Sequence, residues 1–309
     1  MTVNSAVLRG KNGRNRVHQT TGDRVFDVFA TVILLLAILL VAYPLLYVVS
    51  ASFSSTTAVM SGRVWLLPVE PSLEAYKAVF KYDSIMTGYL NSIIYTVLGT
   101  AVNLVLTTLC AFCLSRKDFY GRKIVGGMVL FTMLFNAGLI PNYLLIKNLG
   151  WLDTLWALII PNAMNAWYVI LMRSYFENSI PEELFEASEI DGCTVAGQLM
   201  RIAIPLSGPI IAVIALYCAV GIWNSYFDAF IYLSDKEKFP LQVVLRNILI
   251  LNQMDMNTVA DLRDMASRQG MSNLLKYAVI VVSSAPLLIM YPFVQKFFVK
   301  GIMVGSVKG

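Results

Sequence analysis

Residues 181 to 209 read PEELFEASEIDGCTVAGQLMRIAIPLSGP, an acidic, amphipathic stretch between two apolar segments. Pro181 suits a first helical turn, and the two glutamates that follow it favour the positive end of a helix dipole. Leu184, Ala187 and Ile190 then recur at helical spacing. The first part of the stretch therefore predicts a short helix.

The dipeptide Asp191-Gly192 is expected to end this helix, because glycine adopts the left-handed conformation at little cost. A second apolar run then begins and continues to Pro205. Small residues near the turn, including Ala187 and Ser188, would let another protein approach the backbone closely. We interpret the stretch as a helix-turn-helix docking site; an ordinary solvated acidic loop is the alternative.

The whole chain is too apolar for a soluble domain of its size. Its 309 residues are 57% hydrophobic and 14% charged, with a mean hydropathy of +0.66, so a membrane protein is expected. The net charge of +5 does not indicate nucleic acid, because the basic residues are scattered at the ends of apolar segments.

Six apolar runs predict six transmembrane helices and an all-α membrane fold. The expected spans are residues 26–50, 88–114, 124–146, 154–172, 205–227 and 274–293. Together they form a transmembrane domain, residues 26–293, between tails 1–25 and 294–309, with the docking stretch in a loop, residues 173–204. The first run is too long for a signal peptide, so we expect it to remain uncleaved.

Charge places both tails in the cytoplasm. An even number of spans leaves the two ends on one side, and basic residues gather in both tails and in the connection 115–123. The docking loop 173–204 is then cytoplasmic as well. This orientation is deduced from charges outside the loop, so it tests the docking interpretation independently.

Several polar and aromatic residues of the spans have the chemistry that a sugar requires. Amide donors occur together with aromatic faces, which gives a weak substrate path of Asn162, Asn165, Trp223, Asn224 and Tyr226. Amides also join helices to one another, and aromatic residues also form interfacial belts, so both alternatives stay open. Pro141 and Pro161 predict kinks in their spans.

Motifs for catalysis and for metal binding are missing from the sequence. No GxxxxGK(S/T) phosphate loop occurs, so ATP would be hydrolysed by another polypeptide. The single histidine, His18, lies in the tail, and the Cys110/Cys113 pair has no partner ligands nearby. We therefore expect no catalytic residue, metal or bound cofactor. The lack of acidic residues at span centres argues against a proton-coupled secondary transporter, and a membrane scaffold would not need the docking stretch.

The docking stretch resembles the EAA loop of ABC importer permeases. The matching residues are Glu186-Ala187-Ser188, Gly192 and Ile204-Pro205, with Ser188 in place of the usual second alanine. Longer segments at 138–141, 223–225, 240–245 and 299–309 are similar to MalG-like permeases of the carbohydrate uptake transporter-1 family, within it the LplC/YtcP-type group.

This resemblance implies a type I ABC importer permease fold in a bacterial cell membrane, with a cytoplasmic EAA coupling helix. It implies three kinds of partner: a MalF-type sister permease, two ATPase subunits that bind ATP and Mg, and an extracytoplasmic sugar-binding protein. The residues implied at the ATPase are Glu186, Ala187, Ser188, Asp191, Gly192 and Pro205, together with Gly305, Lys308 and Gly309 of the tail. Importers of non-sugar solutes share the loop, so the carbohydrate class depends on the resemblance alone.

Overall fold

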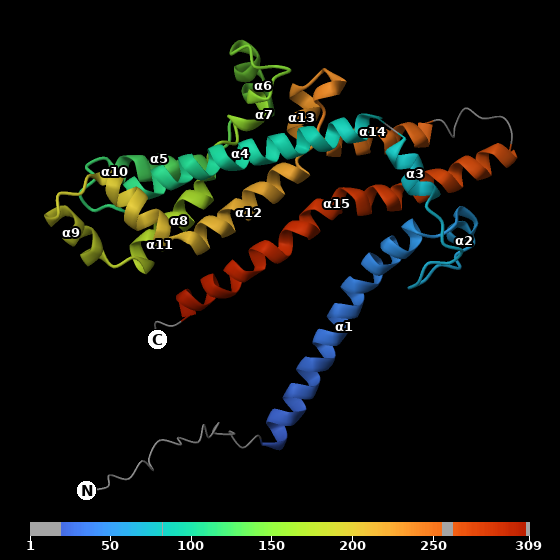
Figure 1. The fold of residues 1–309 in the computed structure, drawn as a ribbon, viewed down its shortest axis with the longest axis horizontal. Coiled ribbons are helices and arrows are strands. Elements are labelled where there is room, and N and C mark those ends of the chain that lie inside the picture. The colour runs from blue at the N-terminus through green and yellow to red at the C-terminus, as the bar shows by residue number, and fades with distance from the viewer. Residues whose placement is uncertain (1–19, 82, 255–261, 307–309) are drawn as a thin grey trace, which may run out of the picture. The chain divides into compact units, whose positions relative to one another are not determined.

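The computed structural model of the protein describes residues 20–81, 83–254 and 262–306 (Figure 1). Every regular element in those ranges is helical, as the composition predicts. The chain divides into two units, residues 1–47 and residues 48–309.

Helix α1 (Thr21–Ser52) begins at a reciprocal cap. The backbone N–H of Thr20 donates to the Asp23 carboxylate at 2.8 Å, and the N–H of Asp23 donates to the Thr20 hydroxyl at 3.3 Å. These bonds satisfy N–H groups that have no partner inside the helix. The apolar side chains that follow are exposed, as expected of a helix that contacts lipid.

The second unit contains fourteen further α-helices in its described residues. Their bounds are α2 (Thr56–Met60), α3 (Glu74–Phe80), α4 (Asp83–Ser115), α5 (Arg122–Leu134), α6 (Leu139–Asn148), α7 (Trp156–Ile159), α8 (Ala166–Ser179), α9 (Glu182–Ile190), α10 (Val195–Gln198), α11 (Ile204–Leu206), α12 (Gly208–Asn224), α13 (Phe227–Tyr232), α14 (Leu241–Met254) and α15 (Leu262–Ser306). A π-helical turn, Leu199–Ala203, joins α10 to α11, and a 3-10 turn, Lys236–Lys238, precedes α14.

The described residues contain three single helices that can cross a bilayer, not the six predicted. These are α1, α4 and residues 273–292 of α15. Two further spans are possible if each sharply bent pair counts as one: α5 with α6, bent by 117°, and the segment 195–206 with α12, bent by 82°. The count therefore reaches five, and the expected span 154–172 is missing as a continuous helix.

Backbone chemistry explains two of the breaks inside expected spans. Span 154–172 consists of α7 and α8 with an irregular segment between them that contains Pro161, which has no N–H to donate. The break in span 124–146 does not occur at Pro141, which lies in the first turn of α6. It occurs before Gly138, whose φ of +85° lies in the left-handed region.

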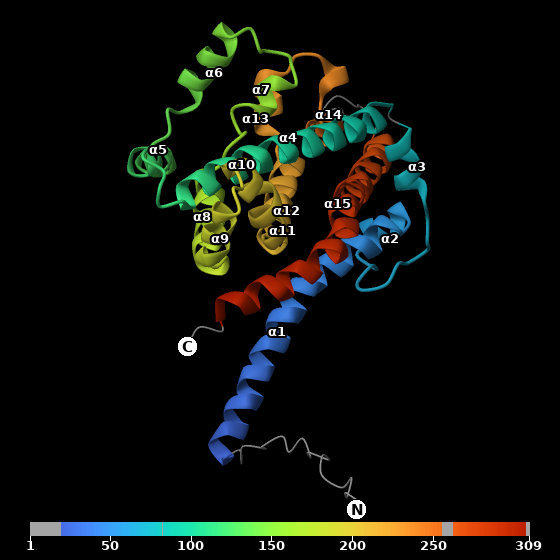
Figure 2. The same cartoon turned by 60° about the vertical axis from the view of Figure 1, so that its left-hand side comes forward.

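Helix α4 is the central element of the second unit. It packs against α8, α12 and α14, and α12 in turn packs against α15 (Figures 1 and 2). One buried cluster includes Phe112, Met172 and Ile214 from α4, α8 and α12. A second joins α4, α14 and α15. Both figures show α9 and α10 at the end of α4 where Ser115 lies.

Candidate functional site

The predicted helix-turn-helix is present as a hairpin of α9 and α10, residues 182–198. Gly192 has a φ of +74°, and the chain around it forms a Schellman motif. The N–H of Cys193 donates to the carbonyl of Ser188 at 2.9 Å, and the N–H of Gly192 donates to that of Glu189 at 3.0 Å. Thr194 then caps α10 by accepting from the N–H of Gly197 at 3.2 Å. Local cap chemistry thus determines the turn.

Phe185 anchors the α9–α10 hairpin to the helices behind it. Its side chain is 4% exposed and lies 6.1 Å from the Phe112 ring, centroid to centroid. The Arg116 guanidinium lies 4.3 Å from the Phe185 ring centroid and pairs with Glu189 at 3.2 Å. The anchor therefore joins α9 to the last turn of α4 and the connection that follows it.

Gln198 holds the two helices of the hairpin together from within. It is 1% exposed, and its Nε2 approaches the carbonyl oxygen of Phe185 at 3.3 Å, the Ser188 hydroxyl at 3.0 Å and the Glu189 carboxylate at 3.2 Å. A buried amide with several acceptors restricts relative motion of α9 and α10. The hairpin is therefore expected to move as one body.

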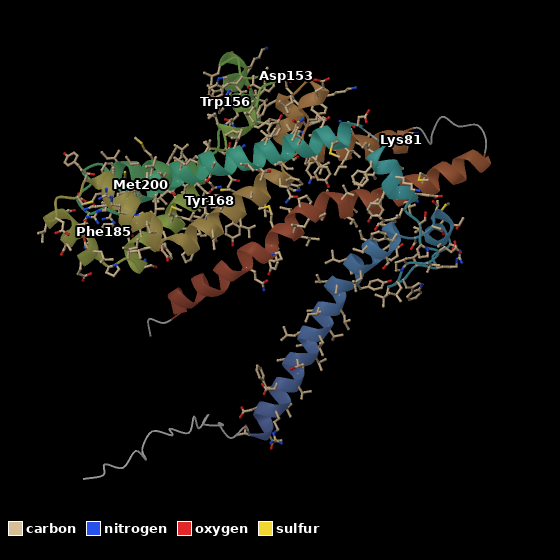
Figure 3. The ribbon with its side chains drawn as sticks, in the orientation of Figure 1. Lys81, Asp153, Trp156, Tyr168, Phe185 and Met200 are labelled. Atoms are coloured by element: carbon tan, nitrogen blue, oxygen red, sulfur yellow. The ribbon has the colours of Figure 1, made fainter. Side chains whose placement is uncertain are left out.

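Large apolar side chains are exposed on the α9–α10 hairpin and on the π-helical turn that follows it, among exposed acidic residues such as Glu186 and Asp191. Ile190 is 88% exposed, Met200 63%, Val195 62% and Leu184 43%. Figure 3 shows Met200 and Phe185 at the same end of the second unit. Exposed apolar side chains grouped around a small turn indicate a surface that another protein covers.

The predicted docking residues divide by their surroundings. Glu186 and Ala187 are exposed, and Glu186 forms no hydrogen bond or ion pair with the described residues. Ser188 faces inward, since its hydroxyl donates to the Phe185 carbonyl at 2.7 Å. Asp191 is the residue at which α9 ends. Pro205 lies in α11, after the π-helical turn, and cannot donate a backbone hydrogen bond.

The residues of the C-terminal tail can be described only in part. Gly305 belongs to α15, which extends to Ser306, beyond the expected span end at residue 293. The helix therefore continues through most of the expected tail, residues 294–306, although Gly301 and Gly305 lie within it. Lys308 and Gly309 lie outside the described residues.

A cavity of about 270 Å³, called the polar cavity here for the amide, phenol and carboxylate groups set in its otherwise largely apolar lining, lies between α4, α7, α8, α12 and α13. Of the predicted substrate path, Asn162 and Asn165 line it. Asn162 donates from its side-chain Nδ2 to the Asp228 carboxylate at 2.8 Å, and the backbone carbonyl of Asn162 accepts from Nδ2 of Asn103 at 3.2 Å. Asn165 also caps α8, accepting from the N–H of Trp167 at 2.9 Å. Amides and a carboxylate are thus available to hydroxyl groups.

The other three path residues do not line the cavity. Trp223 is 5% exposed, and its indole N–H donates to the carbonyl of Ser283 at 3.0 Å, so it joins α12 to α15. Asn224 donates back to the carbonyl of Val220 at 2.9 Å. Tyr226 is exposed on the surface of the unit, near Arg246.

The cavity contains residues that sequence reasoning missed. Tyr95, Tyr168 and Tyr217 contribute phenol groups, and Asp228 contributes the carboxylate. Tyr168 and Tyr217 lie with their rings nearly parallel, 6.3 Å between centroids (Figure 3 labels Tyr168). Asp228 was detectable as a lone acid in an aromatic run just after the expected fifth span.

Asp153 fixes a junction between the α6–α7 connection and residues 232–238 (Figure 3). Its Oδ1 accepts from the backbone N–H groups of Asp235 and Ser234, both at 3.0 Å, and its Oδ2 pairs with Lys238 at 3.0 Å. The Asp235 N–H, the Lys238 ammonium and the Ser234 N–H lower the pKa of Asp153 to about 2. Among the described residues, no group of three potential ligands is placed to hold a metal ion.

A helical membrane protein with a polar cavity and a rigid hairpin exposed at one end is typical of transport permeases. The family model described as "Binding-protein-dependent transport system inner membrane component" matches residues 13–304. The chain therefore belongs to that family.

Individual relatives and a solved structure agree with this family. The chain is 43% identical over 288 residues to the polygalacturonan/rhamnogalacturonan transport system permease protein YtcP of Bacillus subtilis, covering 93% of this chain and 99% of the relative. It is 41% identical over 294 residues to protein LplC of the same organism, covering 95% and 98%. A crystal structure of a bacterial ABC transporter for the acidic polysaccharide alginate contains a chain with a TM-score of 0.81 and 37% identity, covering 91% and 99%.

Proposed function

We propose that this chain is the membrane permease of an ATP-driven importer of oligosaccharides. It would act with a MalF-type sister permease, two ATPase subunits that bind ATP and Mg, and an extracytoplasmic sugar-binding protein. The relatives support this proposal, since YtcP and the alginate transporter are both described as carrying polysaccharide material. Hydrolysis belongs to the ATPases, so this chain contributes a path and a lever.

The observation that carries the proposal is the α9–α10 hairpin, which exposes large apolar side chains beside acidic ones and is held internally by buried contacts. Ile190 and Val195 are exposed on either side of the Gly192 turn, while Phe185 packs the hairpin against Phe112 of α4 and Gln198 bonds α10 to α9. A docked partner that moves such a body transmits its motion to the helices behind it, whereas a loose loop would absorb it. Glu186 stands free beside these exposed side chains for a charge-assisted contact with an Arg or Lys of the ATPase.

The second part of the proposal concerns orientation. Basic tails and the basic connection 115–123 favour the cytoplasm for both termini and for the α9–α10 hairpin. A cysteine placed at position 118 should react with an impermeant reagent only from the cytoplasm, and one at position 236 only from outside. The opposite pattern would place the hairpin beyond the reach of any ATPase.

The polar cavity is the proposed sugar contact of this subunit. Asn162 and Asp228, joined at 2.8 Å, can accept or donate hydrogen bonds to hydroxyl groups, and Asn165 lines the same wall. The sister permease would complete the path. Tail residues Gly305, Lys308 and Gly309 are proposed to reach the ATPase pair.

Reconstitution tests the proposal directly. The complete complex in proteoliposomes should take up labelled oligosaccharide only when ATP and the binding protein are both supplied. Uptake driven by an ion gradient without ATP would support a secondary transporter instead. ATP-dependent uptake of an amino acid but of no saccharide would support an importer of a non-sugar solute.

A further inference from the structure

We propose that Arg246, with Tyr226 and Phe230, forms a recognition site for the carboxylate groups of acidic saccharides. The inference rests on the proposed function, because it specifies the class of oligosaccharide that the importer takes. It concerns a surface separate from the hydroxyl-binding groups of the polar cavity.

The geometry places one cation against two aromatic rings. Arg246 lies on α14, and its guanidinium carbon is 4.6 Å from the Phe230 ring centroid and 5.7 Å from that of Tyr226. The two rings are spaced four residues apart, Tyr226 at the N-cap of α13 and Phe230 within it, and so lie on the same side of that helix. They are 50% and 43% exposed, so solvent reaches the group.

Arg246 has no carboxylate partner among the described residues, unlike two other cations that flank the helices. Lys238 pairs with Asp153 at 3.0 Å, and Arg63 pairs with Glu70 at 2.9 Å. The nearest acid along α13, Asp228, is hydrogen bonded to Asn162 and forms no ion pair with Arg246. The positive charge is therefore available to an external anion.

Contact with aromatic rings orients a guanidinium for binding a carboxylate. An arginine held by ring faces keeps its N–H groups in one plane, and the free edge of that plane matches the two oxygens of a carboxylate. Aromatic faces that remain exposed can contact the apolar C–H face of a pyranose. A uronate unit provides both features, whereas a neutral sugar gains little from the cation.

The position of α13 connects this site to the polar cavity. Ser225, Asp228 and Ala229 line the cavity, while Tyr226 and Phe230 lie toward Arg246. One short helix thus carries hydroxyl-binding groups on one face and the carboxylate site on another. A saccharide chain that contacts α13 would meet both.

The test compares an acidic saccharide with its neutral ester. Proteoliposomes with the complete complex and its binding protein would be given labelled trigalacturonate or trimannuronate, and separately the fully methyl-esterified trimers. We expect Arg246→Gln to lower import of the acid at least about tenfold relative to import of the ester, since it removes a charge-assisted hydrogen-bonded pair. Arg246→Lys keeps the positive charge but not the planar guanidinium, so its ratio of acid import to ester import should lie between those of the wild type and Arg246→Gln.

Lys236→Gln is the matched control, because it removes an exposed positive charge near the same helix and should leave the acid-to-ester ratio unchanged. An Arg246→Gln variant with the wild-type ratio would overturn the carboxylate site, and so would equal losses with both substrates. Wild-type import of the neutral ester, or of another neutral oligosaccharide, without import of the acid would overturn the inference and leave the proposed function standing. Unchanged basal ATP hydrolysis in the variants would show that the complexes are assembled.

Discussion

Gln198 donates from its side-chain Nε2 to the carbonyl oxygen of Phe185 at 3.3 Å, and this buried bond joins the two helices of the α9–α10 hairpin. Phe185, whose side chain anchors α9 to α4, is therefore also bonded to α10 through its backbone carbonyl. Motion imposed on the exposed face of the hairpin has a continuous route to the membrane helices through this pair.

Removing the Gln198 amide should loosen the hairpin without unfolding the protein. In Gln198→Leu the acceptors on Phe185, Ser188 and Glu189 lose a buried donor, at a cost of about 1–3 kcal/mol. We expect normal membrane insertion, faster amide exchange across residues 182–198, and weaker retention of the ATPase on an affinity column. Exchange at the wild-type rate would show that Gln198 does not fix α9 to α10.

Two adjacent cations offer a matched pair of variants. The Arg116 side chain is 15% exposed, stacked on Phe185 and paired with Glu189, so Arg116→Ala should destabilise the hairpin by about 1–3 kcal/mol. Lys117 and Glu182 form an exposed pair, worth about 0–1 kcal/mol, so Lys117→Ala should change little. Both variants remove one positive charge. Equal loss of ATPase binding in the two would indicate a general charge effect instead of an anchor.

Substitutions at Gly192 separate backbone strain from bulk. An added Cβ meets no atom within 4 Å inside the chain, yet φ is +74°, so a β-branched residue costs about 1–2 kcal/mol through the backbone alone. Gly192→Val should insert and pair with the sister permease but bind ATPase weakly and import no sugar. Gly192→Asn is the control, because asparagine tolerates the left-handed region. Failure of both variants would indicate that bulk at the interface, and not φ, is decisive; normal uptake by Gly192→Val would mean that the turn does not dock.

Acid should weaken the junction at Asp153. Its folded pKa of about 2 lies below the unfolded value of about 3.9, so its stabilisation is present above pH 4 and is lost as the pH falls from about 4 to 2. Thermal unfolding of wild type and Asp153→Asn should differ most near pH 6 and converge toward pH 2. A difference that stays constant over this range would show that the charge of Asp153 is not what stabilises residues 232–238.

The C-terminal residues can be tested by truncation. Because α15 continues to Ser306, deleting residues 305–309 shortens the end of a helix and removes Lys308. We expect lower ATPase stimulation by the loaded binding protein with unchanged membrane insertion. Lys308→Ala alone would show whether charge or length matters. Full stimulation in the deletion would remove the tail from the proposed ATPase interface.

The hairpin could be predicted because its signals are local. Pro181, Asp191-Gly192 and the threonine cap act on neighbouring backbone groups, so the sequence alone indicates where α9 ends and α10 begins. These local signals do not show which residue of α9 is buried. Leu184 and Ile190 recur at helical spacing but are exposed, whereas Phe185 is buried, because Phe112 and Arg116 approach it from a distant part of the chain.

Local sequence patterns likewise could not show which residues of the spans line the cavity. Pro161 predicted a kink between α7 and α8, but hydropathy sums apolar residues over a window and did not show that the helix is interrupted there, which places Asn162 and Asn165 beside the cavity. Trp223 was indistinguishable from a sugar-stacking ring until its bond to Ser283 was seen. Asp228 was overlooked because it falls outside the expected span, whereas tertiary packing brings it to Asn162.

The central claim, that the exposed face around Gly192 docks on an ATPase, is tested most directly by a photo-crosslinking amino acid at position 190. Ile190 is 88% exposed and Leu67, in the connection between α2 and α3, is 77% exposed, so position 67 provides a control of similar accessibility. In the assembled complex, the account predicts a crosslink from position 190 to the ATPase and none from position 67. Absence of an ATPase crosslink at 190 in a complex that still hydrolyses ATP and imports sugar would contradict it.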